Sequence, residues 1–155
     1  MQKNQFTSLS KDSPEWLSNF VSIYQTLSTN NLDLLATIYH NDITFIDPLH
    51  RVEGFDDLYK YFSGLYQNLL ACEFVIEKVI FDGKEAAIYW TMTYQHSKLN
   101  KGELVSVSGS SHIQGKEDKV IYHRDYLDVG AMIYEQIPLF GKLTKWIKAK
   151  AASNA

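Results

Sequence analysis

The stretch from Cys72 to His96, CEFVIEKVIFDGKEAAIYWTMTYQH, indicates how this chain folds. Two runs rich in β-branched and aromatic residues lie on either side of Asp82-Gly83, a dipeptide that strongly favours a tight hairpin turn. Strands joined by so short a turn pair antiparallel. The stretch therefore predicts two long antiparallel strands in the second half of the chain.

Two more strands are expected beyond this hairpin. The run ELVSVSGSSHIQ follows a turn at residues 100–102, and the run KVIYHRDYLD follows a polar turn at residues 115–118. Short turns between successive strands predict a four-stranded antiparallel sheet over residues 72–128.

The first half of the chain has helical spacing instead. Ser13-Pro14-Glu15 favours a helix start, because it combines a capping hydroxyl, a proline at the first helical position and an acid in the first turn. A short strand, DITFIDP, is expected between the second and third helices. The apolar positions that define the three helices are Trp16, Phe20, Ile23, Tyr24 and Leu27, then Leu32, Leu35, Ile38 and Tyr39, and then Leu58, Tyr61, Phe62, Leu65, Tyr66 and Leu69.

This order of elements predicts the α+β class, with a strongly curved antiparallel sheet wrapped on the N-terminal helices. A chain of 155 residues with 45% hydrophobic and 14% aromatic residues can bury one sizeable core. We expect a loose N-terminal segment at residues 1–12, one domain at residues 13–140 and a basic C-terminal helix or tail at residues 141–155.

Composition narrows the location and the partners. The sequence has no run of about eighteen apolar residues for a membrane span, its N-terminus lacks the apolar core of a signal peptide, and its one cysteine, Cys72, fits a reducing compartment. We therefore expect a cytoplasmic protein. The net charge of −3 argues against nucleic-acid binding. The tail carries four lysines and no acid between residues 139 and 150, so the whole chain's −3 and the tail's +4 leave −7 elsewhere.

The last predicted strand turns ionisable side chains toward its apolar side. Alternate residues of a strand face the same way, so His123 and Asp125 share the side of Ile121 and Leu127. Arg124 faces the other way and is a poor ion-pair partner for Asp125. We therefore favour an acid or base in the interior over a structural ion pair for Asp125.

Two segments, IYHNDITFIDPLHRVEG and VIYHRDYLDVGAMIYEQIPLFG, together with the order of elements, resemble the nuclear transport factor 2-like superfamily. Within it the chain looks like the SnoaL-like branch, which includes polyketide cyclases, and is similar to ketosteroid isomerases and limonene-epoxide hydrolases. The resemblance implies a cone-shaped, cystatin-like roll in which helices close one side of a bent sheet around a deep pocket. It also implies pairing of two subunits through the outer face of the sheet.

The resemblance assigns roles to particular positions. Asp47, in IDP, matches the general base of the isomerases, and Asp125 matches the catalytic aspartate of the epoxide hydrolases and the acid–base aspartate of the cyclases. The tyrosine of the isomerases' oxyanion hole falls on Ile23, beside Tyr24, and their oxyanion-hole acid falls near Ser111. The Arg and Asp pair that the epoxide hydrolases carry on an inner strand has no counterpart in AIYWTMTYQ.

The candidate site follows from strand parity and from this resemblance. We expect Asp125, Asp47 and His123 to be catalytic, and we expect a substrate to be bound by Trp90, Tyr94, Tyr24, Tyr61 and Ser111. Simpler structural roles stay open: a turn role for Asp47, a core histidine for His123 and core packing for the aromatic residues. No cofactor is expected, and the five scattered histidines lack metal-ligand spacing.

The expected ligand is a small, mostly apolar molecule. The domain would act on it as a cofactor-independent isomerase, cyclase or hydrolase that uses its pocket carboxylates, or would serve as a non-catalytic ligand-binding or association module on the same fold. A homodimer is expected through the sheet face that carries Ser106, Ser108, Tyr122 and Tyr126. For the basic tail, a solvated helix that acts as a lid is favoured over contact with a membrane surface.

Overall fold

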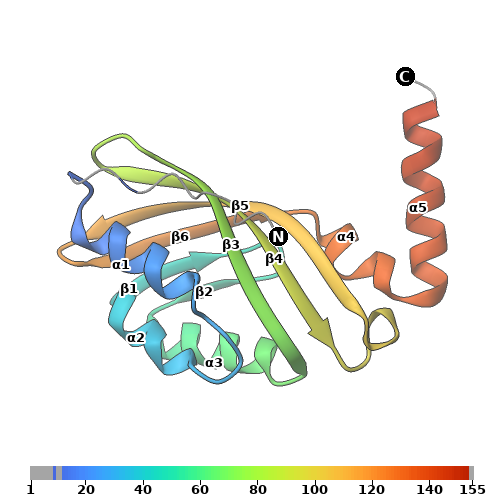
Figure 1. The fold of residues 1–155 in the computed structure, drawn as a ribbon, viewed down its shortest axis with the longest axis horizontal. Helices are drawn as coiled ribbons and strands as arrows, with labels where there is room; N and C mark the ends of the chain where they lie inside the picture. Colours follow the sequence, from blue (N-terminus) through green and yellow to red (C-terminus); the bar gives the residue numbers. More distant parts are fainter. Residues whose placement is uncertain (1–8, 10–11, 154–155) are drawn as a thin grey trace, which may run out of the picture.

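The chain folds into a bent six-stranded sheet with helices on one side (Figure 1). The computed structural model describes residue 9 and residues 12–153. The helical elements are α1 (Glu15–Tyr24), η1 (Leu32–Leu34), α2 (Leu35–Ile38), α3 (Phe55–Tyr66), η2 (Asn100–Gly102), α4 (Val129–Met132), η3 (Tyr134–Gln136) and α5 (Pro138–Ser153). The strands are β1 (Tyr39–Ile46), β2 (Arg51–Glu53), β3 (Leu69–Phe81), β4 (Glu85–His96), β5 (Leu104–Lys116) and β6 (Lys119–Leu127).

The four strands predicted for the second half of the chain pair antiparallel in sequence order, from β3 to β6. The turn between β3 and β4 explains the first hairpin. Gly83 adopts a φ of 100°, which side-chain-bearing residues rarely reach. The Asp82 carboxylate accepts hydrogen bonds from the backbone N–H groups of Lys84 and Glu85, so this local sequence closes the turn by itself.

Two strands from the first half extend this sheet. The strand order is β2-β1-β6-β5-β4-β3, and β1 lies parallel to β6, whereas β2 is antiparallel to β1. The antiparallel sheet predicted over residues 72–128 is thus confirmed, and the one parallel pairing involves β1, whose neighbour in the sheet was not predicted. Along the chain, β2, α3 and the three strands β3 to β5 lie between β1 and β6, so no turn between adjacent segments fixes their relative direction.

The core lies between the concave face of the sheet and helices α1, α2 and α3, which Figure 1 shows on the same side. The apolar spacing predicted for α1 is confirmed at Trp16, Phe20 and Tyr24, which are buried, whereas Leu27 is buried in the segment that follows the end of the helix. Burial of apolar surface of this kind contributes about 25 cal/mol per Å² to folding. The sheet and the helices therefore hold each other in place.

Some boundaries differ from the prediction. Tyr39 belongs to β1 and not to a helix, and β3 begins at Leu69. The basic helix starts at Pro138, and Gly141 lies inside it, where a Cβ atom would overlap the backbone of Glu135. The segment expected to be loose, residues 1–12, lies mostly outside the described residues.

Candidate functional site

Asp125 lies on the inner face of the sheet, with one carboxylate oxygen fixed by two donors. The pairing of β5 with β6 sets Ser111 directly opposite Asp125. The Ser111 hydroxyl donates to Oδ1 at 2.5 Å, and Nε2 of His123 lies 2.7 Å from the same oxygen. The His123 side chain is 0% exposed and that of Asp125 is 17% exposed. These two buried side chains therefore fix the orientation of the Asp125 carboxylate.

A chain of hydrogen bonds continues from His123 into the helices. Nδ1 of His123 lies 2.6 Å from the hydroxyl of Tyr39, which lies 2.6 Å from the hydroxyl of Tyr24. A carboxylate only accepts hydrogen bonds, so Nε2 carries the proton, and in the neutral imidazole Nδ1 accepts from Tyr39. Tyr24 then donates to Tyr39, and every bond in the chain points toward Asp125.

The phenols in this chain remain protonated. Burial raises the pKa of Tyr24 and of Tyr39 well above 10.0, and the negative charge of Asp125 raises each further. The phenols are therefore available as donors across the ordinary pH range. The chain can fix the tautomer of His123, which is how a neighbouring hydrogen bond sets which ring nitrogen holds the proton.

A second donor chain reaches Asp125 from β4. The indole Nε1–H of Trp90 donates to the Ser111 hydroxyl at 2.8 Å, and Ser111 in turn donates to Asp125. The Trp90 ring occupies the space over Gly109, where any Cβ atom would overlap it. The absence of a side chain at Gly109 therefore lets Trp90 reach Ser111.

The other oxygen of Asp125 is open. Among residues 9 and 12–153, none donates a hydrogen bond to Oδ2, whereas every buried side-chain nitrogen or oxygen in that part of the chain has a partner. Oδ2 is therefore not a buried atom. One oxygen is held by two donors and the other has none, so a molecule bound beside Asp125 could form a hydrogen bond with Oδ2.

Asp47 follows β1 and makes a turn. Its Oδ1 accepts from the backbone N–H groups of Leu49 and His50, and its Oδ2 accepts from the Tyr61 hydroxyl at 2.5 Å. Burial, the bond to Asp47 and the charges of Asp47 and Asp125 together raise the pKa of Tyr61. Tyr61 thus lies near both carboxylates, and both oxygens of Asp47 are already engaged.

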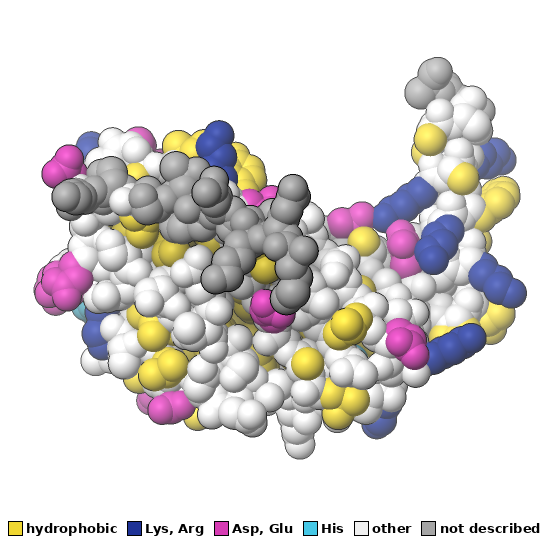
Figure 2. Space-filling model, viewed as in Figure 1, with side chains coloured by type: hydrophobic (Ala, Val, Ile, Leu, Met, Phe, Trp, Pro, Cys, Tyr) yellow, Lys and Arg dark blue, Asp and Glu magenta, His cyan; other side chains and the backbone are white. Residues whose placement is uncertain are grey.

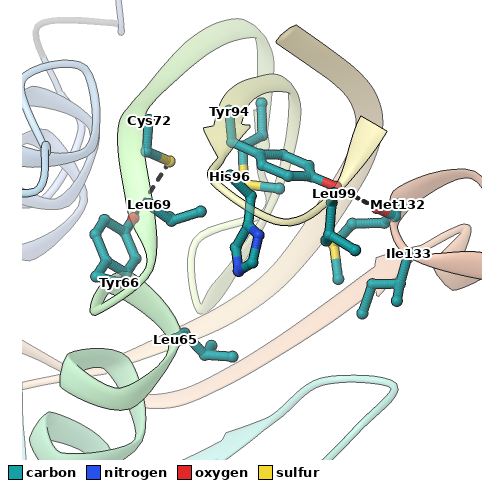
Figure 3. Close-up of a pocket in the computed structure, with 10 residues that line it drawn as sticks. Leu65, Tyr66, Leu69, Cys72, Tyr94, His96, Leu99, Met132 and Ile133 are labelled. Carbon is teal, nitrogen blue, oxygen red and sulfur yellow. Dashed lines mark hydrogen bonds between the residues drawn. The ribbon is translucent and has the colours of Figure 1, made fainter. Parts of the chain in front are cut away.

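An apolar cavity of about 210 Å³ lies between the end of α3, the strands β3 and β4, and α4 (Figure 3). Its lining comprises Leu65, Tyr66, Leu69, Cys72, Met92, Tyr94, His96, Leu99, Met132 and Ile133. The Tyr94 hydroxyl donates to the Met132 carbonyl, which ties α4 over the cavity. Burial raises the pKa of the Cys72 thiol, so the thiolate needed for nucleophilic chemistry is disfavoured. Neither Asp125 nor Asp47 lines this cavity.

One row of inner side chains separates the cavity from Asp125. The strand register pairs Gly109 with both Trp90 and Leu127, one row beyond Asp125 and Ser111, and the cavity begins in the next row with Met92. The Trp90 indole thus lies between the cavity and Asp125. A ligand that occupied both regions would contact this ring.

The predicted site residues fall into three groups. Four of them, Asp125, His123, Ser111 and Trp90, join in one hydrogen-bonded network, which Tyr24 enters through Tyr39. Asp47 and Tyr61 form a separate pair beside it, and Tyr94 lies in the apolar cavity.

Tyr39 belongs to this network but was not among the predicted site residues. Helical spacing placed it on the second helix, whereas it is the first residue of β1 and stacks on His123 with ring centroids 5.9 Å apart. The alternation of the apolar residues Tyr39, Ile43 and Phe45 was the available signal, since all three occupy odd positions and are buried.

Clusters that could hold a metal and helices that could span a membrane are both absent from the described residues. No group of three or more His, Cys, Asp or Glu side chains within residues 9 and 12–153 could hold a metal ion. No helix in the same part of the chain is long and apolar enough to span a membrane.

Solved structures define the class of this fold. A protein from Jannaschia sp. CCS1, described as a putative SnoaL-like polyketide cyclase, superimposes with a TM-score of 0.68 at 15% identity. The match covers 81% of this chain and 94% of that one. An NTF2-like protein of unknown function from Burkholderia pseudomallei gives 0.67 at 9% identity, over 77% and 95%. An epoxide hydrolase from M. tuberculosis, described as LEH-like, gives 0.65 at 16% identity, over 78% and 86%. The protein thus has the nuclear transport factor 2-like fold.

The sequence itself identifies the family. The profile of the SnoaL-like domain matches residues 20–123, more than half of the chain. The chain therefore belongs to the SnoaL-like domain family. No match was found among curated protein sequences.

Proposed function

We propose that this SnoaL-like domain binds a small, mostly apolar molecule and exchanges a proton with it through Asp125, without a cofactor. The reaction class is isomerisation, cyclisation or the addition of water. The observation that carries the proposal is the asymmetry of the Asp125 carboxylate, whose Oδ1 is held by Ser111 and His123 while Oδ2 is open.

His123 acts as a positioning residue in this proposal. Its buried ring holds Asp125 on one side and is held by Tyr39 on the other, so the carboxylate cannot rotate without breaking bonds. Fixing the orientation of a catalytic group lowers the entropy lost when the reacting geometry forms. Proton transfer by a positioned side chain contributes about 10²–10⁴-fold to a rate.

Asp47 has a different part. Both of its oxygens accept hydrogen bonds, so it could exchange a proton with a ligand only after Tyr61 or the turn moves. We assign Asp47 the task of holding Tyr61, whose hydroxyl donates its proton to Oδ2 of Asp47. The acid–base step then depends on Asp125 alone.

The test is the substitution Asp125→Asn. The amide oxygen can accept from Ser111 and His123 as Oδ1 does, and the amide nitrogen takes the open position, so the variant should melt at nearly the wild-type temperature. A panel of small enones, epoxides and polyketide-like ketones should give turnover with the wild type that falls by at least about 10²-fold in the variant. Asp118→Asn, in the exposed turn before β6, is the matched control and should keep full activity.

Two results would overturn the proposal. One is unchanged turnover in Asp125→Asn. The other is a large drop in melting temperature together with an unchanged ligand profile, which would show that the carboxylate serves the fold alone.

A non-catalytic binding module is the second candidate, and the apolar cavity favours it. That cavity holds no carboxylate, so a ligand could occupy it without meeting Asp125. Leu99→Trp would fill the cavity with a larger side chain. If ligands raise the melting temperature of the wild type and of Asp125→Asn equally, fail to do so with Leu99→Trp, and are never converted, the binding role is the correct one.

A further inference from the structure

The helix α5 carries an apolar face that points away from the rest of the molecule. Five large apolar side chains on it are between 52% and 82% exposed: Leu139, Phe140, Leu143, Trp146 and Ile147. Most of them follow one another at intervals of three or four residues, so they form a single stripe along the helix. Figure 1 shows α5 standing apart at one end of the molecule, and Figure 2 shows its apolar and lysine side chains together.

The opposite face of α5 holds the helix to the body. Gly141 is buried against the backbone of Glu135, and Nζ of Lys148 lies 2.6 Å from Asp128 and 2.7 Å from Glu135. These residues are spaced seven apart, on the side of the helix away from Leu143 and Trp146. The sequence favoured a solvated helix that acts as a lid. The structure does not place α5 as a lid over the cavity, because the apolar stripe of the helix faces outward.

The charge on α5 has one sign. The helix contains four lysines and no acidic residue, whereas the rest of the chain sums to −7. Within the described residues, Lys142, Lys145 and Lys150 have no carboxylate within ion-pair distance, and Nζ of Lys150 lies 5.1 Å from the centre of the Trp146 ring. Lys142 and Lys145 lie along one side of the stripe, and Lys150 lies at its C-terminal end.

We infer that α5 is a membrane-surface helix, which lays its apolar stripe into the headgroup region of a bilayer that contains anionic lipids. A helix with tryptophan, phenylalanine and leucine on one face and lysines around it has the composition that binds in this plane. The lysines complement the negative surface of such a bilayer. The stripe faces away from the body, so the helix can lie flat on a surface without a clash with the sheet.

The same charges disfavour pairing of two α5 helices. Their stripes would bring Lys142, Lys145 and Lys150 of each copy close to those of the other, and like charges repel. Docking also brings the cavity close to the bilayer, because Met132 and Ile133 line the cavity a few residues before α5 begins. This inference does not depend on the acid–base role of Asp125.

The native tryptophans provide a direct readout. The chain has three tryptophans, of which Trp16 and Trp90 are buried in the core and Trp146 is 58% exposed. Addition of vesicles of phosphatidylcholine with phosphatidylglycerol should shift the emission to the blue as Trp146 leaves water, and the protein should sediment with the vesicles. Neutral phosphatidylcholine vesicles should give much less of both, and added salt should weaken binding. Trp146→Phe should abolish the shift, because Trp16 and Trp90 stay buried in the core.

Matched triple variants separate local from overall charge. Replacement of Lys142, Lys145 and Lys150 by Gln should weaken binding about fivefold for each lysine, or roughly 100-fold in all. Replacement of Lys78, Lys84 and Lys116 by Gln changes the net charge equally on exposed positions of the sheet and its turns, and should leave binding unchanged. Leu143→Ser with Ile147→Ser should weaken binding roughly tenfold or more.

Three results would overturn the inference. The first is no binding to anionic vesicles, which would leave α5 a solvated helix. The second is equal weakening by both triple lysine variants, which would show that net charge alone acts. The third is lipid-free self-association that Leu143→Ser with Ile147→Ser abolishes, which would show that a second copy covers the stripe.

Discussion

At the scale of single residues, His123 is the centre of the polar interior. Both ring nitrogens of this fully buried side chain are bonded, one to Tyr39 and one to Asp125, and Phe45 packs against the ring at 4.9 Å. Removal of one partner leaves the other buried polar group without a hydrogen bond, and this desolvation penalty is larger than the net free energy that a typical hydrogen bond contributes. The network therefore both orients Asp125 and makes the interior sensitive to loss of any member.

Tyr39→Phe should destabilise the fold without a change in its shape. The variant removes one hydroxyl and leaves Nδ1 of His123 and the Tyr24 hydroxyl without their shared partner, so we expect a loss of about 1–3 kcal/mol in the free energy of unfolding. Tyr59→Phe, at an exposed position on α3, should change it by less than about 0.5 kcal/mol. Urea denaturation measures both, and an equal effect of the two substitutions would contradict the network.

The buried phenols should make the protein sensitive to alkaline pH. The pKa values of Tyr24, Tyr39 and Tyr66 are raised by burial, so above pH 10 the unfolded chain releases phenolic protons that the folded chain retains. The unfolded state then binds fewer protons, and stability must fall as pH rises further, whereas the contribution is fully present below pH 10.

Measurement of the free energy of unfolding as a function of pH checks this sign. Tyr39→Phe should make the alkaline decline shallower, and Tyr59→Phe should not. Tyrosinate absorbance that appears in the folded protein near pH 10 for all ten tyrosines would contradict the prediction.

At the scale of elements, β5 positions the site because it has no side chain at Gly109. Gly109 leaves room for the Trp90 indole, which crosses it to reach Ser111, and alternate residues of β5 on the outer side carry hydroxyls instead. One strand thus provides the floor for an aromatic ring, a donor to Asp125 and a polar outer surface. The alternation of a strand, with its period of two, makes these three tasks compatible.

Gly109→Ala should push Trp90 away from Ser111. A Cβ at this position overlaps the ring, and such overpacking typically costs about 1–3 kcal/mol. Gly64→Ala in α3 is the matched control, because a Cβ there meets nothing within 4 Å and alanine favours a helix by about 1 kcal/mol. The two glycine substitutions should therefore shift the melting temperature in opposite directions, and a gain in stability from Gly109→Ala would refute the role of Gly109.

At the scale of the whole molecule, the outer face of the sheet is the surface for which a partner is expected. It carries a row of hydroxyl pairs, in which Thr91 bonds Ser108 at 3.1 Å and Thr93 bonds Ser106 at 2.8 Å. Tyr126, on the same face, is 49% exposed with Arg124 over its ring. Aromatic and arginine side chains on a flat face are typical of protein interfaces.

We expect a homodimer through this face. Ser108→Glu should dissociate it, because a two-fold interface places like charges close to each other. Ser22→Glu on the exposed side of α1 adds the same charge on the helical side and should have no effect. Light scattering should give twice the chain mass for the wild type and Ser22→Glu, and a monomeric wild type would refute the expectation.

The sequence by itself determined the parts of this protein that depend on near neighbours. The turn at Asp82-Gly83, the alternation that puts His123 and Asp125 on one face and the helical spacing of α1 are all set by side chains within a few residues of each other. The sequence also placed Ser111 near the site, through its resemblance to known enzymes. These local preferences were enough to predict the α+β class and the face of the sheet on which Asp125 lies.

The tertiary structure alone decided the contacts between distant segments. Tyr39 and His123 lie 84 residues apart and meet only because β1 closes against β6 in parallel, a pairing that no turn specifies. The same holds for the open Oδ2 of Asp125, for the separation of the cavity from that carboxylate by Trp90, and for the outward direction of the stripe on α5. Each depends on how whole elements that lie far apart in the sequence pack against one another, which no local pattern records.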